Sequence, residues 1–449
     1  MGKDYSRRNF LQTAAGAAGL ALVTKAIALP EPAYAQEWAA GTSGETVQFG
    51  IIGIGMQGSG LLKTAVTLPG TKCIAACDLW DGRQTLAKEI AGPDIATTRK
   101  YQELLANKDI AALIVAVPDH WHKQIVVDAV TAGKDVYCEK PMSHSVADGA
   151  AMVAAAKKSG RIVQIGSQRT SSALLAKAKQ LYDQGAIGEL LSVELSLGRN
   201  DPTGAWEYPP PPGLAPDNFD WDTWQGAVPK KAFDPITYAR WRCWKEYGTG
   251  VAGDLMVHLV SGMMFVTGMN QAPTRAFASG GIVRWKDGRN MPDLQAAIFE
   301  YGSVPAYVRL TLGTETTEMT RLMGPKGMLE IRERDFTYTP QRGIDTAPSY
   351  YAQGFPAAMR KAYEKQWEDE HDPAPGKEFV AEAVTFSGPS YDDEAPHLWN
   401  YFEAVRTRKP VVQDAVFGHH AAAACHMANQ AYFRKATVTW DAASDTIKG

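Results

Sequence analysis

The residues from Val47 to Asp78 constrain the fold of this chain more than any other stretch. An apolar run at 47–52 is followed by the glycine turn Gly53-Ile54-Gly55-Met56-Gln57-Gly58, by a helical pattern at 59–68, and by a second apolar run that ends at Asp78. A strand, a helix and a second strand with this spacing predict one βαβ unit.

The glycine turn within this unit predicts a dinucleotide site. Gly53 permits a tight turn out of the strand, Gly55 lets the backbone approach a pyrophosphate, and Gly58 lets the helix pack closely on the sheet. The carboxylate of Asp78 can accept hydrogen bonds from an adenosine ribose diol and would repel a 2′-phosphate. The sequence therefore predicts NAD rather than NADP, although Arg83 is close enough to leave that preference open. A glycine-rich turn without a ligand is the alternative.

The first 35 residues are typical of an export signal. Arg7 and Arg8 form a twin arginine, residues 14–23 form an apolar segment too short to span a bilayer, and Ala33-Tyr34-Ala35 is a small-residue cleavage site. We expect a Tat signal peptide over 1–35, export by the Tat machinery, and a periplasmic or extracellular mature chain without stable membrane insertion. An amphipathic N-terminal helix or an uncleaved anchor is the alternative.

Charge and side-chain chemistry exclude several partners. The net charge of −3 gives no reason to expect nucleic acid or an anionic membrane surface. The five cysteines are expected to be small buried hydrophobic residues, without a disulfide framework. His419 and His420 are adjacent, but no carboxylate or cysteine stands at ligand spacing, so we predict no metal site.

Helical and apolar patterns alternate from Asp78 to residue 165, which predicts a doubly wound parallel sheet. We expect a Rossmann domain over 46–168, with its ligand chemistry at the carboxyl ends of the strands. Two of those ends carry polar groups, at residues 118–122 and at Glu139-Lys140-Pro141.

A second domain is expected over 169–449. Strand patterns follow one another there with few helices between them, so we predict an α+β domain with an open, mainly antiparallel sheet. These patterns lie at 192–197, 274–285, 294–301, 305–312 and 328–331. The long loop at 199–228 is expected to be a lid or a binding loop.

These motifs resemble the family named after glucose-fructose oxidoreductase, inositol dehydrogenase and the MocA protein (Gfo/Idh/MocA). The matching segments include GIGMQG at 53–58, PDHWH at 118–122, AGKDVYCEKP at 132–141 and WRCWKEYGTGVAGDLMVH at 241–258. Glu-Lys-Pro after a strand, together with a later Asp-x-x-x-His, is specific to this family. The resemblance covers nearly all of the expected mature chain and implies a homo-oligomer.

The resemblance implies that Lys140, Asp254 and His258 are catalytic. Lys140 and His258 would share the proton of an oxidised hydroxyl, and Asp254 would position the substrate or the lysine. The residues themselves agree, since an ammonium beside a positive nicotinamide ring can exchange a proton, and Asp254 and His258 are spaced to share one helix face. The alternatives are a solvent-exposed turn lysine and a core or helix-cap histidine.

We also expect two groups of binding residues. Those expected at the cofactor are Gly53, Gly55, Met56, Gln57, Gly58, Asp78, Pro118, His120, His122, Glu139 and Lys140. Those expected at the substrate are Arg242, Trp244 and Tyr247, because a guanidinium and flat aromatic faces suit a polyhydroxylated ring. Trp206, Trp221 and Trp224 could do the same, although aromatic residues near a domain hinge are usually core.

We therefore expect an exported oxidoreductase that transfers a hydride between a tightly bound nicotinamide cofactor and a sugar, glycoside or polyol hydroxyl. Little free NAD is expected outside the cell, so the cofactor should stay bound and be recycled in place. One alternative is a redox-neutral NAD-dependent glycoside hydrolase that acts through a transient 3-keto sugar. The other is a non-catalytic accessory protein that retains the nucleotide for structural reasons.

Overall fold

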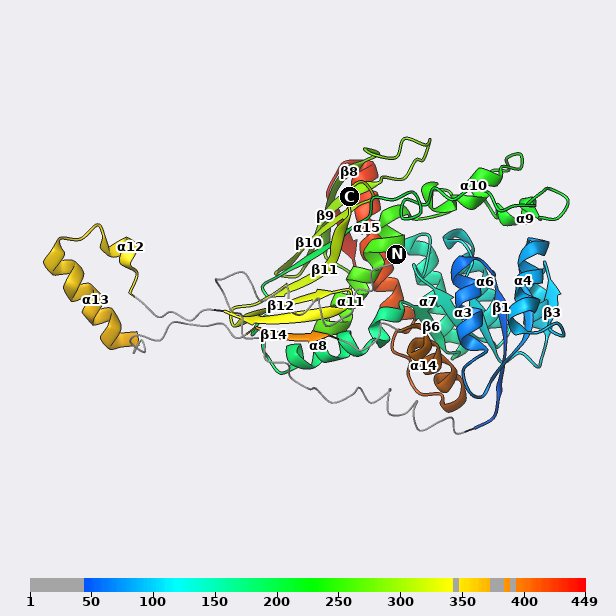
Figure 1. Cartoon of the computed structure of the whole chain (residues 1–449), viewed down its shortest axis with the longest axis horizontal. Helices are drawn as coiled ribbons and strands as arrows, with labels where there is room; N and C mark the ends of the chain where they lie inside the picture. Colours follow the sequence, from blue (N-terminus) through cyan, green and yellow to red (C-terminus); the bar gives the residue numbers. More distant parts are fainter. Residues whose placement is uncertain (1–43, 342–346, 372–382, 388–392) are drawn as a thin grey trace, which may run out of the picture.

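The computed structural model describes residues 44–341, 347–371, 383–387 and 393–449. The expected signal peptide at 1–35 lies outside these residues. The described chain forms two sheets that lie side by side, with helix α15 between them (Figure 1).

The first sheet has six parallel strands in the order β3-β2-β1-β4-β5-β6. Its strands are β1 (Val47–Ile52), β2 (Thr71–Cys77), β3 (Ala96–Thr98), β4 (Ala112–Val115), β5 (Asp135–Glu139) and β6 (Val163–Gly166). Its helices are α3 (Met56–Ala65), α4 (Asp81–Ala91), α5 (Tyr101–Ala106), α6 (Asp119–Thr131) and α7 (Val146–Ser159). The expected doubly wound parallel sheet is confirmed, and strand order reverses between β1 and β4, where such sheets bind ligands.

Burial on both faces explains the apolar runs of this sheet. All four residues of β4 are buried, as are all five residues of β5. One face is covered in part by α14 (Glu394–Thr407), whose Phe402 ring lies 5.2 Å from that of Phe49 in β1. Helix α14 therefore packs on the first sheet although it comes late in the sequence.

The second sheet has ten strands in the order β14-β13-β12-β11-β7-β10-β9-β8-β15-β16. Every described pairing is antiparallel except that of β7 with β10, so the expected mainly antiparallel sheet is confirmed. Its strands are β7 (Ser192–Gly198), β8 (Arg275–Gly281), β9 (Leu294–Tyr301), β10 (Val304–Thr311), β11 (Thr316–Met323), β12 (Gly327–Arg332), β13 (Asp335–Pro340), β14 (Val384–Ser387), β15 (Val438–Asp441) and β16 (Thr446–Lys448).

Helices cover one face of the second sheet. They are α8 (Ala173–Asp183), which follows the short 3-10 turn η1 (Gln168–Ser171), α11 (Val257–Thr267) and α15 (Ala415–Arg434). The sequence pattern predicts one regular helix over 253–268, but the segment Ala252–Met256 is π-helical and α11 begins only at Val257. A π-turn adds a residue to the helix and is frequent at functional sites.

A long segment at residues 199–249, here named the strap, joins β7 to the π-turn. It contains the short helices α9 (Trp221–Trp224) and α10 (Pro235–Ala239) and the 3-10 turn η2 (Trp241–Cys243). Figure 1 shows α9 and α10 above the helices of the first sheet rather than beside their own sheet. The strap therefore brings part of the second half of the chain to the edge where the first sheet binds ligands.

Two further helices, α12 (Ser349–Ala352) and α13 (Ala357–His371), lie apart from both sheets (Figure 1). They fall between β13 and β14 in the sequence. Among the described helices, none combines the length and the apolar character that crossing a bilayer demands.

Candidate active site

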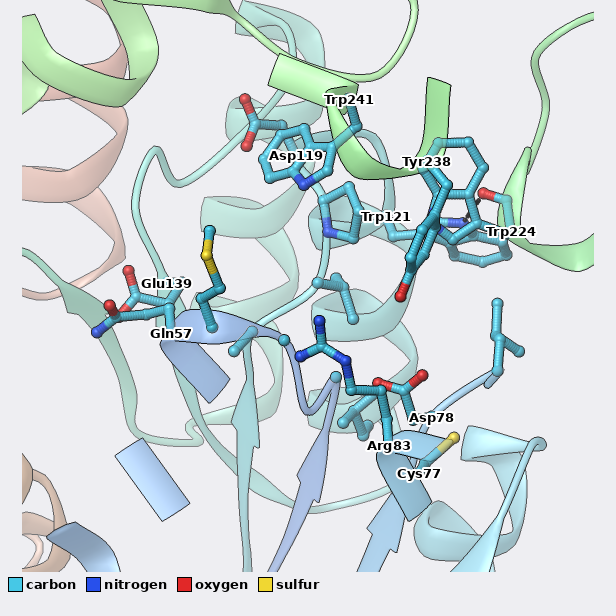
Figure 2. Close-up of a pocket in the computed structure, with 18 of the residues that line it drawn as sticks. Gln57, Cys77, Asp78, Arg83, Asp119, Trp121, Glu139, Trp224, Tyr238 and Trp241 are labelled. Carbon is cyan, nitrogen blue, oxygen red and sulfur yellow. Dashed lines mark hydrogen bonds between the residues drawn. The ribbon is translucent and has the colours of Figure 1, made fainter. Parts of the chain in front are cut away.

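A cavity of about 580 Å³ runs along the carboxyl ends of the first sheet. Asp78 and Arg83 line one end, and Lys140 and Asp254 line the other. In Figure 2, Asp78 and Arg83 lie below Trp224, Tyr238 and Trp241 of the strap, and Gln57 lies beside Glu139 at the left. Residues of the first sheet and of the strap together build the wall of the cavity.

The glycine turn has the backbone that a dinucleotide site requires. Gly53 has φ +89°, and a Cβ there would stand 2.4 Å from the carbonyl oxygen of Ala116. A Cβ on Gly58 would stand 2.0 Å from the carbonyl oxygen of Gly53, whereas Gly55 faces the cavity and meets nothing closer than 3.8 Å. Helix α3 begins at Met56 without a side-chain cap, so its first N–H groups are available for a phosphate.

Asp78 directly follows β2 and accepts a hydrogen bond from the glycine turn. The N–H of Ile54 donates to its Oδ2 at 2.8 Å, and the N–H of Trp80 donates to its Oδ1 at 3.0 Å. Burial raises the pKa of Asp78, while these N–H groups and the Arg83 cation oppose the rise. The guanidinium of Arg83 donates to the carbonyl of Ile54, so a cation lies beside the carboxylate in the cavity wall.

Lys140, Asp254 and Arg242 form a partly buried ion cluster at the other end. The Lys140 ammonium lies 3.2 Å from Oδ1 of Asp254, and Nε of Arg242 donates to the same oxygen at 2.9 Å. Burial alone would raise the pKa of Asp254, but the two cations outweigh it and hold that pKa well below its usual range. Asp254 is therefore a carboxylate that fixes a lysine and an arginine at the cavity.

His258 follows on the same helix. Burial, reinforced by the Lys140 cation, lowers its pKa well below the ordinary value, so the imidazole is neutral at neutral pH. Its Nδ1 is buried and has no hydrogen-bond partner among the described residues. A neutral imidazole near a lysine can accept a proton from a hydroxyl.

The π-turn that carries Asp254 is fixed to the first sheet. The N–H and Oγ1 of Thr249 donate to Oδ2 of Asp119, at 3.0 and 2.7 Å, and Asp119 is the first residue of α6. Gly253 permits this contact, because a Cβ there would stand 1.6 Å from Oγ1 of Thr249. These contacts fix the position of the π-turn, which carries Asp254, relative to the first sheet, which carries Lys140.

Comparison with known proteins agrees with this architecture. A model of the oxidoreductase family with an NAD-binding Rossmann fold matches residues 47–167, and a model of the GFO/IDH/MocA C-terminal domain matches residues 175–330. The chain belongs to the Gfo/Idh/MocA family. The family resemblance inferred from the sequence motifs is confirmed. The matching family model describes an NAD-binding domain, which agrees with the expected cofactor.

Named relatives of this Gfo/Idh/MocA chain match about a third of its length. Inositol 2-dehydrogenase of Salmonella typhimurium is 35% identical over 150 residues, which cover 33% of this chain and 45% of that protein. The 2,7-anhydro-N-acetylneuraminate hydratase of Mediterraneibacter gnavus is 31% identical over 166 residues, which cover 36% of this chain and 43% of that protein. The chain thus spans less than half the length of these curated relatives.

Solved structures share the fold over most of the chain. Levoglucosan dehydrogenase in complex with NADH has a TM-score of 0.62 at 17% identity and covers 88% of this chain and 99% of that one. The WlbA dehydrogenase of Bordetella pertussis, in complex with NADH and UDP-GlcNAcA, has a TM-score of 0.64 at 17% identity, with 89% of this chain and 99% of that one covered.

The structure separates the residues expected at the cofactor into two groups. Those that line the cavity are Gly53, Gly55, Met56, Gln57, Asp78, Pro118, Glu139 and Lys140. Three do not line it. Gly58 packs on the turn, and His122 lies between the carbonyls of Val117 and Pro141. The ring of His120 lies between the carbonyls of Trp224 and Tyr247 in the strap.

The residues expected at the substrate are also divided. Arg242 lines the cavity. Tyr247 is buried, with its ring 4.7 Å from that of Trp224. Trp244 is partly buried and packs against the aromatic residues around Tyr247 on one side and against the core of the second sheet on the other. Trp206 is a core residue and Trp221 stacks on Trp224. Trp224 does line the cavity, and the wall also takes three aromatic residues that the sequence did not single out, Tyr208, Tyr238 and Trp241. No periodic pattern in the loop distinguishes these three from the aromatic residues that pack internally.

Glu139 is a titratable group in the cavity wall. Burial raises its pKa to about 7, against the opposing effect of the Lys140 cation. Its Oε1 accepts from Nε2 of Gln168 at 2.6 Å, and its Oε2 accepts from the N–H of Lys140 at 3.1 Å. Among the described residues, no cluster of histidine, cysteine or carboxylate side chains is placed to hold a metal ion.

Proposed function

We propose that this chain is an oxidoreductase that acts on a hydroxyl group of a sugar, glycoside or polyol with a tightly held NAD. The observation that carries the proposal is the contact between Lys140 and Asp254 at one end of the dinucleotide cavity, with Arg242 on the same carboxylate. A bound nicotinamide would supply hydride acceptance and return at that end. The named dehydrogenases among the relatives support the substrate class.

The residues of the chain handle the proton. His258 is neutral at neutral pH and can accept the proton of a hydroxyl, while the ammonium of Lys140 can hydrogen-bond to the oxygen that loses it. Asp254 keeps Lys140 in place and stays ionised because of its two cationic neighbours. Arg242, with its guanidinium stacked 4.3 Å from the ring of Trp241, can hold further hydroxyls of the substrate.

A redox-neutral reaction is the second candidate. In it the substrate is oxidised to a 3-keto sugar, the neighbouring C–H becomes acidic, a substituent is eliminated, water adds, and the hydride is returned. The hydratase relative supports this candidate by its name. The same residues would serve both reactions. An accessory role without catalysis is disfavoured because Lys140 and Asp254 line the cavity, and His258, although it does not line it, lies close enough to both for their charges to shift its pKa.

The test is the near-ultraviolet absorbance of the purified protein before and after the addition of a panel of sugars and glycosides, without added NAD. A reduced-nicotinamide band that appears with one compound supports hydride transfer to a resident cofactor. Product analysis then separates a persistent keto sugar from a cleaved glycoside. Nicotinamide present but unresponsive to every compound would favour the accessory role.

We also propose that the mature chain is exported by the Tat machinery and assembles as a homo-oligomer. The twin arginine at Arg7 and Arg8 supports export. An exposed row of Phe277, Ile298 and Tyr307, paired across three neighbouring strands, supports assembly through the open sheet face. Sedimentation of the Tyr307→Lys variant tests assembly, since a buried charge should shift the population toward monomer.

A further inference from the structure

We propose that the strap, residues 199–249, is the outer wall of the cofactor site and sets how slowly NAD is released. The inference rests on the proposed function to the extent that NAD occupies the cavity. It assigns retention of the cofactor to residues that follow the first sheet in the sequence and lie outside both the glycine turn and the cluster of Lys140 and Asp254.

The first observation is a set of backbone contacts between the strap and the end of β2. The N–H of Asp81 donates to the carbonyl of Asn218 at 3.1 Å, and the N–H of Asp220 donates to the carbonyl of Leu79 at 3.0 Å. Trp80 and Phe219 form an antiparallel bridge between these bonds. The strap thus pairs with the chain directly after Asp78, the expected ribose ligand.

The second observation is an anchor on the first turn of α6. The carbonyl of Trp224 accepts a hydrogen bond from Nε1 of Trp121 at 2.9 Å, and Nε2 of His120 lies 2.9 Å from the same oxygen. The N–H of His120 donates to the carbonyl of Tyr247 at 3.3 Å. Burial lowers the pKa of His120 to about 4, so this anchor carries no charge at neutral pH.

The third observation is an aromatic core inside the strap. Phe219, Trp221, Trp224 and Tyr247 are buried together, and the ring of Phe219 lies 4.7 Å from that of Tyr238. Phe219 does not line the cavity, whereas Tyr238 and Trp224 do. Phe219 therefore supports the wall from behind.

Together these contacts hold the strap over one side of the space that a dinucleotide would fill. Tyr238, Trp224 and Trp241 stand across the cavity from Asp78 and Arg83 (Figure 2). Separation of the strap from β2 and α6 breaks the backbone bonds, exposes the aromatic core and widens the exit for a cofactor that lies between them. Release is therefore coupled to opening of the strap, and an enzyme without an external supply of NAD gains a cofactor that stays bound between turnovers.

The test compares Phe219→Ala with Phe336→Ala as a matched control. Phe336 is an equally buried phenylalanine in β13, within the second sheet and outside the cavity wall. Each holoprotein is loaded with NADH, and the rate of NADH release is followed by fluorescence after addition of excess NAD. We expect Phe219→Ala to release NADH at least about tenfold faster than the unmodified protein, because loss of this buried ring removes the packing that supports the cavity wall from behind. We expect Phe336→Ala to release it at the unmodified rate.

Equal release rates for Phe219→Ala and the unmodified protein would overturn the proposal, as would equal acceleration by both variants. If Phe219→Ala does not fold, hydrogen exchange of the unmodified protein decides: the amides of Asp81 and Asp220 should exchange more slowly with NADH bound than after its removal, and equal exchange would reject the proposal. The outcomes are separable from those of the proposed function. Strap-dependent retention of NADH without reaction of any sugar would refute only the function, and sugar-dependent reduction with release unaffected by the strap would refute only this inference.

Discussion

The ammonium nitrogen of Lys140 lies 3.2 Å from Oδ1 of Asp254 and 3.1 Å from its backbone carbonyl oxygen. Lys140 follows β5 of the first sheet, and Asp254 lies in the π-turn before α11, so the pair joins the two halves of the chain. Because both side chains are largely buried, the contact persists only while the halves stay packed together. The proposed chemistry therefore depends on the interface between the two sheets as much as on the residues themselves.

Replacing Lys140 by Ala should lower turnover about 10²- to 10⁴-fold, the range for loss of a positioned proton donor. Asp254 keeps its bond to Arg242, so the fold and the nicotinamide content should not change. Single-turnover absorbance and the cofactor stoichiometry measure both effects. Lys179→Ala, in an exposed pair with Asp183, is the control. Undiminished turnover would remove Lys140 from the catalytic assignment.

The π-turn should reject a side chain at Gly253 and accept one at Gly262 in the following helix. A Cβ at Gly253 would stand 1.6 Å from Oγ1 and 2.5 Å from Cβ of Thr249, whereas at Gly262 the nearest atom is 3.6 Å away. We expect Gly253→Ala to lower the free energy of unfolding by roughly 1–3 kcal/mol and to reduce turnover. Gly262→Ala should be neutral or stabilise by up to about 1 kcal/mol, because alanine favours a helix. Thermal unfolding of both variants would show the difference. Equal stability of the two variants would mean that Gly253 does not pack against Thr249 as described.

Glu139 should make stability fall as the pH rises toward neutrality. Its pKa is raised from 4.5 to about 7 by burial, so the folded chain holds this proton where the unfolded chain has lost it. Between these values the native state binds more protons than the unfolded state, and the free energy of unfolding decreases with pH. Glu139→Gln should flatten that decrease, whereas Glu103→Gln, at an exposed position, should leave it unchanged. Identical pH slopes in denaturant titrations of all three proteins would show that Glu139 ionises normally.

Replacing Asp78 by Ser should relax the preference for NAD over NADP. A serine keeps a polar group near the N–H of Ile54 but removes the charge that would repel a 2′-phosphate. We expect affinity for NAD to fall by roughly tenfold, the effect of losing one charge-assisted hydrogen bond, and affinity for NADP to rise. Asp183→Ser, at the exposed pair with Lys179, serves as the control. An unchanged affinity ratio in titrations of NADH and NADPH fluorescence would place the ribose elsewhere.

Replacing Arg7 and Arg8 together by Lys should abolish export by the Tat route, since that route recognises the twin arginine as an address. Fractionation of cells that express each form, with detection of the processed chain, measures this. Export of the lysine variant at the unmodified level would instead favour another route or an uncleaved anchor.

Local patterns were sufficient to predict the first sheet and its ligand-binding edge. Gly53 is needed for a positive φ, Asp78 ends an apolar run, and Lys140 follows a strand buried on both faces, so each has a signal within a few neighbouring residues. Strand β3 (Ala96–Thr98) was missed because three residues are too short for a periodic pattern. Strands β11 and β13–β16 were missed as well, since their exposed faces are polar and their pairing depends on neighbours distant in sequence.

The sequence by itself determined which residues could bind a dinucleotide and which could move a proton, because turn geometry, strand burial and side-chain chemistry are local properties. Only the tertiary structure decided which aromatic residues reach the cavity. Tyr238 and Trp241 line it while Tyr247 and Trp244 do not, and the difference follows from how the strap pairs with the end of β2. Contacts of that kind join residues more than a hundred positions apart and depend on the packing of two sheets, so no periodicity along the chain encodes them.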